Sequence, residues 1–96
     1  MLDTLSPPPQ RGSANTTVLF FGAVSDRLGR SHRVRIPVGG LSLAGLKALI
    51  AAQLPEAAHA LAAPGVRAAV DQVLILDEAH IHPGAEVAFF SAFSGG

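Results

Sequence analysis

Few residues of this 96-residue chain could do chemistry, and the last two, Gly95 and Gly96, are the first to consider. Glycine carries no side chain and accepts almost any φ, so a Gly-Gly segment can enter a narrow tunnel in a partner. The carboxylate of Gly96 would then reach the end of that tunnel without a neighbouring side chain. Because glycine is also common in frayed chain ends, the pair predicts a reactive terminus only if the rest of the chain supports one.

Other polar candidates lie late in the chain. His80 and His82 are two residues apart and would point the same way in an extended segment, but a zinc site needs a third and a fourth ligand. The other histidines are far away in sequence, so we predict no metal site. We interpret Asp77 and Glu78 as a solvated loop, because paired catalytic carboxylates need opposed faces and a pocket. Nucleophile-elbow, phosphate-loop and zinc-protease motifs are all missing, so we predict no enzyme activity for the chain on its own.

The composition narrows the class of protein. Hydrophobic residues make up 49% of the chain, which predicts a globular domain. The chain has no cysteine, which excludes disulfides and thiolate chemistry, and its formal net charge of zero argues against nucleic acid as a partner. No apolar stretch is long enough to span a membrane, and the N-terminal segment does not resemble a secretory signal. We therefore expect a cytoplasmic protein that has no membrane partner.

The charges are unevenly distributed along the chain. The early basic cluster is interpreted as a solvated face rather than a phosphate site. The later acidic residues would favour a basic partner. The early cluster is Arg27, Arg30, Arg33 and Arg35, and the late acidic residues are Asp71, Asp77, Glu78 and Glu86.

The first half of the chain predicts a β-hairpin followed by a helix. Residues 17–23 are β-branched and aromatic, with Val18 and Phe20 on one face and Leu19 and Phe21 on the other. Residues 32–38 alternate, which places Val34, Ile36 and Val38 in the core. Ser42 is then expected to cap a helix whose apolar stripe ends before Pro55; the stripe is Leu43, Leu46, Ile50 and Leu54.

The second half predicts a short helix and more strands. The alanine-rich residues 56–63 favour a second short helix, and residues 66–70, 73–76 and 86–90 favour strands. A main helix on one face of a small mixed sheet gives an α+β fold. We expect a flexible N-terminal extension over residues 1–16, a domain over 17–90 and a flexible tail over 91–96.

The aromatic residues before the tail predict a partner surface, namely Phe89, Phe90 and Phe93. Neighbours on a strand point to opposite faces, so at least one of Phe89 and Phe90 must point away from the core. An exposed aromatic side chain at that place favours an interface with another protein.

Four segments of the chain together resemble a known family. They are VLFFGAVSDRLG near the start, the helix after Ser42, RAAVDQ at 67–72 and PGAEVAFFSAFSGG at the end. Over residues 17–96 the chain resembles the small subunit of molybdopterin synthase, a sulfur carrier with the ubiquitin-like β-grasp fold. The E-V-A-F-F-x-x-x-x-G-G ending is the most specific part. The order of predicted elements agrees with that fold.

The resemblance implies a mechanism at Gly96. An E1-like enzyme adenylates its carboxylate with ATP, and a persulfide donor then converts the acyl-adenylate to a thiocarboxylate. The tail, in which Gly95 and Ser94 thread behind Gly96, inserts into the large synthase subunit, expected in a heterotetramer. There it gives sulfur to cyclic pyranopterin monophosphate during molybdenum cofactor biosynthesis. The chain is then a non-catalytic donor subunit that binds no permanent cofactor, and ATP is consumed by the activating enzyme.

One departure from the family and two alternatives stay open. The family often has two prolines after the paired phenylalanines, whereas Ser91 and Ala92 stand here. Proline would stiffen the root of the tail. The same fold and ending also serve carriers for thiamine, cysteine or thiolated tRNA. From a different class, the chain could be a ubiquitin-like modifier or an interaction domain whose tail never carries sulfur.

Overall fold

The computed structural model of the chain describes residues 14–91. Predictions for residues 1–13 and 92–96 lie outside the described residues. The elements are β1 (Ala14–Phe21), α1 (Ala23–Leu28), β2 (Ser31–Ile36), β3 (Leu41–Ser42), α2 (Leu43–Gln53), α3 (Ala57–Ala62), β4 (Val66–Val70), β5 (Val73–Ile75), β6 (His80–Ile81) and β7 (Val87–Ser91).

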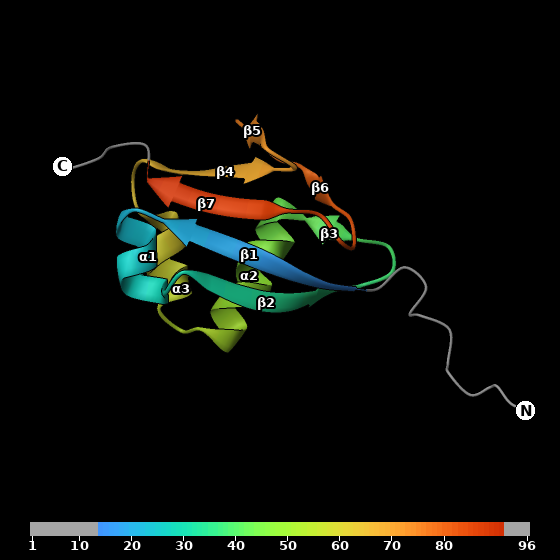
Figure 1. The fold of residues 1–96 in the computed structure, drawn as a ribbon, viewed down its shortest axis with the longest axis horizontal. Coiled ribbons are helices and arrows are strands. Elements are labelled where there is room, and N and C mark those ends of the chain that lie inside the picture. Colours follow the sequence, from blue (N-terminus) through green and yellow to red (C-terminus); the bar gives the residue numbers. More distant parts are fainter. Residues whose placement is uncertain (1–13, 92–96) are drawn as a thin grey trace, which may run out of the picture.

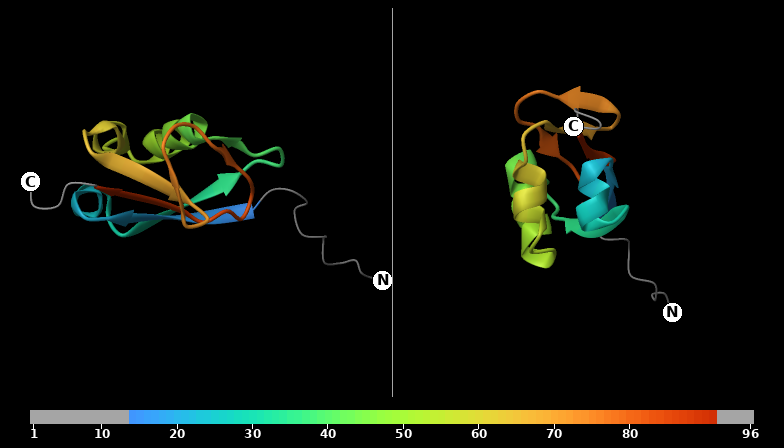
Figure 2. Two further views of the ribbon diagram at one scale, coloured as in Figure 1. Left: turned by 90° about the horizontal axis from the view of Figure 1, so that it is seen from above. Right: turned by 90° about the vertical axis from the view of Figure 1, so that its left-hand side faces the viewer.

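A five-stranded mixed sheet organises the domain, in the order β2-β1-β7-β4-β5 (Figure 1). The central pair β1 and β7 is parallel, whereas the other neighbouring strands are antiparallel. Helices α2 and α3 lie on one side of this sheet (Figure 2), and β3 and β6 form a separate two-stranded sheet. The predicted α+β fold of the β-grasp type, with one main helix and a short second helix, is confirmed.

The core lies between the sheet and the helices. Phe20 of β1 and Phe89 of β7 stack there, with their ring centroids 6.3 Å apart. From α2, Leu46 and Ile50 are fully buried, as the helical stripe predicted. Burying each such side chain contributes about 1.5–3 kcal/mol, which is how a domain of this size holds together.

Ser42 caps α2 as predicted, because its Oγ accepts a hydrogen bond of 2.9 Å from the backbone N–H of Gly45. At the other end, the helix stops at Gln53, and Leu54 adopts an extended conformation before Pro55. Proline disfavours the α region for the residue before it, so the chain leaves the helix there.

A carboxylate from a distant loop also caps α2, and the sequence interpretation missed it. Glu78 is exposed on a loop, as predicted, but its oxygens also accept backbone hydrogen bonds from Leu43 at 2.7 Å and Ala44 at 3.3 Å. It also accepts one from Ala79 at 2.8 Å. The hydrogen bond from Ala79, followed by those from the helix, lowers the pKa of Glu78. The residue therefore ties the loop before β6 to the start of the helix.

The expected domain boundaries need correction at both ends. Strand β1 begins at Ala14 rather than at residue 17. Thr16 is buried, and its hydroxyl accepts a hydrogen bond of 3.3 Å from the backbone of Gly84. At the other end, Ser91 belongs to β7 rather than to the tail. Val38 was predicted to face the core, but β2 ends at Ile36 and Val38 is 69% exposed.

Gly40 occupies a position where a side chain would not fit. Its φ is +76°, a left-handed conformation that favours glycine. A Cβ at this residue would lie 2.6 Å from the carbonyl oxygen of Ile81 and would also clash with the His80 imidazole. The close approach lets the turn after β2 pack directly on β6.

Candidate functional site

The adjacent phenylalanines of β7 point to opposite faces of the sheet. Phe89 is fully buried against Phe20, so the prediction that it contacts a partner is wrong. Phe90 is half-buried and points to the other side. The alternation of a strand requires this division, but the sequence did not show which of the two faces the core. Phe93 lies outside the described residues.

Phe90 belongs to an apolar surface that we call the outer face, the side of the sheet turned away from α2 and α3. Phe21 pairs with Phe90, and Leu19 pairs with Ala88 along the two central strands. The row continues outward, since Ala88 pairs with Ala69 and Ala69 with Leu74. The outer face is therefore Leu19, Phe21, Ala69, Leu74, Ala88 and Phe90. Phe21 and Leu74 are 51% and 50% exposed, which is a large apolar exposure for a small domain.

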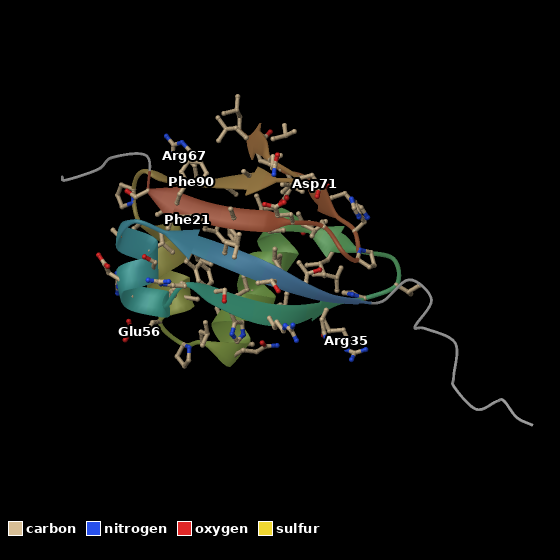
Figure 3. All side chains as sticks on the ribbon, in the orientation of Figure 1. Phe21, Arg35, Glu56, Arg67, Asp71 and Phe90 are labelled. Carbon is tan, nitrogen blue, oxygen red and sulfur yellow. The ribbon has the colours of Figure 1, made fainter. Side chains whose placement is uncertain are left out.

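Arginine side chains border the outer face where β7 ends. Arg67 pairs with Phe90 in register, and Figure 3 places Arg67, Phe90 and Phe21 at the same end of the sheet. On the other side, Arg30 lines a cavity of about 480 Å³ together with Leu19 and Phe21. This end of the sheet thus combines an apolar centre with a basic border. It suits a protein partner whose surface has an apolar centre and an acidic border.

The tail leaves from the centre of the sheet. Ser91 is the last described residue, and its strand β7 is held by β1 on one side and by β4 on the other. A Cβ built on Gly22 would lie 3.8 Å from the Cβ of Ser91, so the turn after β1 packs beside the root of the tail. The predicted site residues Ser94, Gly95 and Gly96 follow and lie outside the described residues.

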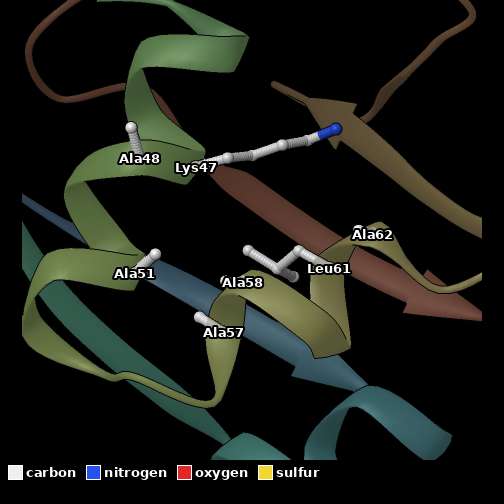
Figure 4. Close-up of a pocket in the computed structure, with 7 residues that line it drawn as sticks. All are labelled: Lys47, Ala48, Ala51, Ala57, Ala58, Leu61 and Ala62. Carbon is white, nitrogen blue, oxygen red and sulfur yellow. The ribbon is translucent and has the colours of Figure 1, made fainter.

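A second pocket lies on the helical side, between α2 and α3. Its volume is about 290 Å³, and alanine side chains and Leu61 form most of its lining (Figure 4). Lys47 is its one charged lining residue. The pocket brings together no nucleophile and no acid–base pair, so its lining offers no chemistry.

The histidines and acidic residues have structural contacts rather than a common site. His82 lies with its Nε2 3.3 Å from a carboxylate oxygen of Asp71, whose other oxygen accepts a backbone hydrogen bond of 3.0 Å from Glu86. His80 packs on Gly40 in the small β3–β6 sheet. Within residues 14–91, no group of three or more His, Cys, Asp or Glu residues could hold a metal ion.

The early arginines do not form a common site either. Arg33 and Arg35 are exposed on β2, opposite Thr17 and Asn15. Their side of the strand faces solvent, as the sequence predicted. Arg27 lies on α1, 3.8 Å from a carboxylate oxygen of Glu56.

Comparison with known proteins identifies the family of the chain. The ThiS family model matches residues 18–96. The chain belongs to the ThiS family. This membership supports a ubiquitin-like sulfur carrier of the ThiS type, a non-catalytic class that works with E1-like activating enzymes and partner enzymes. No curated protein matches the chain.

Two solved structures share the fold of this ThiS-family chain, both from Haloferax volcanii. The solution structure of the HVO 2177 protein has a TM-score of 0.69 at 17% identity, covering 100% of this chain and 99% of that one. The crystal structure of SAMP1 has a TM-score of 0.68 at 17% identity, covering 86% of this chain and 100% of that one. At that identity the likeness shows the fold alone. Within the described part of the chain, no helix is long and apolar enough to cross a membrane.

Proposed function

We propose that this chain is the sulfur-carrier subunit of molybdopterin synthase, with the carboxylate of Gly96 as its reactive group. The proposal rests on one observation above others: the paired phenylalanines of the E-V-A-F-F segment, in a ThiS-family chain, with Phe90 on the outer face. That segment belongs to the ending that is the most specific part of the resemblance to the synthase small subunit.

The chemistry follows from what a carboxylate needs in order to accept sulfur. The carboxylate of Gly96 is a poor electrophile. Attack of one of its oxygens on ATP, in the active site of an E1-like enzyme, releases pyrophosphate and forms an acyl-adenylate. A persulfide sulfur then attacks the carbonyl carbon, AMP leaves, and reduction of the resulting acyl disulfide by a thiol frees the thiocarboxylate. No cysteine of this chain takes part, because it has none.

The outer face is the surface that would bind these partners. Phe21 and Phe90 lie side by side at the end of the sheet from which β7 continues into the tail. A partner that covers this end also receives the tail, so docking and delivery of Gly96 are coupled. Side chains that are apolar and aromatic, such as these, commonly dominate the binding energy of a protein interface.

Intact mass measurement tests the carrier step. After co-expression with its activating enzyme, the chain should gain the mass difference between one sulfur and one oxygen, located at Gly96 by fragmentation. The same spectrum checks that Gly96 is the C-terminal residue of the purified chain. A control variant with one residue added after Gly96 should gain no sulfur and should unfold at the same temperature. If the wild-type chain never exchanges oxygen for sulfur, it is a modifier or an interaction domain.

Complementation tests the pathway separately. We expect the chain to restore molybdoenzyme activity in a strain lacking the synthase small subunit, and to copurify with the large subunit. The second candidate is a sulfur carrier for thiamine, cysteine or thiolated tRNA, and the family match favours it equally because it covers ThiS-type carriers in general. Growth rescue of a thiamine-requiring carrier mutant, without rescue of the molybdoenzyme, would identify that candidate instead.

A further inference from the structure

The free edge of the main sheet, at β5, has a composition that the carrier function does not explain. Strand β5 is the last strand in the sheet order, and it pairs only with β4 among the described strands (Figure 1). From Gln72 to Leu76 the segment reads QVLIL, without a charge, a proline or a glycine. Val73 is 62% exposed and Leu76 is 84% exposed. Edge strands are usually protected by charges or proline, so an unprotected one points to pairing with another strand.

The backbone of Leu74 is oriented for such pairing. Asp71 and Gln72 both have positive φ, at 51° and 69°, which is typical of a two-residue type I′ turn. Val70 and Val73 flank that turn, and the two residues that flank a two-residue turn form a hydrogen-bonded pair. Hydrogen-bonded and non-hydrogen-bonded pairs alternate along antiparallel strands. The N–H and C=O of Leu74 therefore point away from β4, toward the open side.

A second copy of this chain fits that edge poorly. Two identical strands related by a twofold axis pair antiparallel, and a register centred on Leu74 brings the turn residue Asp71 of one copy toward Asp77 of the other. Both side chains are exposed at the two ends of the apolar segment, and the Asp71 carboxylate also contacts His82 and the backbone N–H of Glu86. Like charges brought close across a strand pair destabilise it. The acidic ends thus discourage self-association and favour basic residues on whatever pairs here.

We propose that β5 receives an extended segment of a partner protein by strand addition, apolar at alternating positions and basic at both ends. The outer face supports the same conclusion, because the side chain of Leu74 continues the apolar row of Ala69 and Ala88. A strand added beside Leu74 would extend that row by one position. Main-chain hydrogen bonds would give affinity, and the carboxylates of Asp71 and Asp77 would select the partner by charge. The inference goes beyond sulfur transfer and does not depend on it.

Peptide binding to the full chain tests the proposal. The probe is a capped peptide of alternating valine and threonine with two lysines at each end, and its control carries glutamates in place of the lysines. We expect the lysine peptide to slow amide hydrogen exchange at Leu74 and to bind about tenfold more tightly than the glutamate peptide at low salt. Equal binding of the two peptides, or no change at Leu74, would overturn the proposal.

Two variants make the test specific to this edge. Leu74→Pro removes an outward N–H while leaving the hydrogen bonds to β4 in place, and should abolish binding. Asp77→Lys lies outside β5 and leaves Asp71 at the other end, so it should abolish the preference for the lysine peptide over the glutamate peptide. If Asp77→Lys leaves the preference unchanged, the charge selection is refuted. If sedimentation shows a concentration-dependent dimer that Leu74→Pro abolishes, a second copy occupies the edge and the proposal is wrong.

The outcome is independent of the sulfur-carrier function. A chain lacking Gly96 should bind the lysine peptide as the wild type does, although it cannot carry sulfur. Failure of peptide binding together with normal thiocarboxylate formation would refute the strand addition alone. The reverse result would refute the carrier proposal alone.

Discussion

Phe89 and Phe90 are adjacent, yet replacing each by alanine should have opposite consequences. Phe89 is fully buried and stacks on Phe20. Removing such a side chain from a core typically costs about 3–5 kcal/mol, from transfer and cavity terms together. A chain of this size has a total stability of about 5–15 kcal/mol, so Phe89→Ala should remove a large share of it. Phe90 faces outward, and Phe90→Ala should cost about 1 kcal/mol.

Far-UV circular dichroism, recorded during both urea and thermal denaturation, is the suitable assay, because the chain has no tryptophan and no tyrosine for fluorescence. At about 4–8 °C per kcal/mol, Phe89→Ala should lower the melting temperature by about 12–40 °C. Phe89→Leu keeps part of the buried volume and serves as a milder variant if the alanine chain does not fold, with an expected cost of about 1–2 kcal/mol.

Partner binding should show the reverse order. Phe90→Ala should weaken binding to the activating enzyme by about tenfold or more, whereas Phe89→Leu should leave it nearly unchanged in folded protein. The assignment of faces is refuted if the two alanine variants lose equal stability. It is also refuted if Phe89→Leu, while folded, weakens binding as much as Phe90→Ala.

Three further predictions concern the fold around the site. Glu78→Gln should lower the free energy of unfolding at pH 7 more than the control Asp77→Asn. Because folding lowers the pKa of Glu78, the contribution of its carboxylate is present above the ordinary pKa of 4.5 and is lost as the pH falls through the lowered pKa. The wild type and Glu78→Gln should therefore converge at acidic pH in urea titrations. Gly40→Ala should cost about 1–3 kcal/mol through steric clash and positive φ, whereas Gly39→Ala, which meets nothing within 4 Å, should be nearly neutral in thermal melts. Thr16→Val should lower the free energy of unfolding, measured in urea, by about 0.5–1.5 kcal/mol, because it removes a buried hydrogen-bond acceptor. An unchanged free energy of unfolding would mean that the domain begins after this residue.

The sequence predicted most of the fold because its strongest signals were local. The stripe of α2 and the cap at Ser42 depend on residues a few positions apart, and both are confirmed. The capping contact of Glu78 was not predicted because its partners at the start of α2 are 34 and 35 residues away, and no local pattern records that contact. Val38 was assigned to the core by extending the alternation of β2, but the strand ends two residues earlier.

For the candidate site too, the sequence predicted the local features and not the contacts between distant strands. Alternation predicted that Leu19 and Phe21 share a face opposite to Val18, but it could not show that helices leave that face uncovered. The pairing of Phe21 with Phe90 depends on a parallel register between the first and last strands, which only the assembled sheet defines. Leu74 belongs to the outer face because β5 lies next to β4 in the sheet, and no local sequence pattern predicts that strand order.

The placement of β7 explains how a chain without catalytic side chains can serve as a carrier. A reactive end must move freely beyond its attachment point, while the attachment point must stay fixed relative to the docking surface. Strand β7 meets the second requirement because both of its edges are paired and Phe89 anchors it in the core. Phe90, one residue later, lies on the outer face, and Ser91 ends the strand. Three consecutive residues therefore supply the anchor, the proposed docking contact and the root of the tail, so insertion of one residue within them should disconnect docking from delivery.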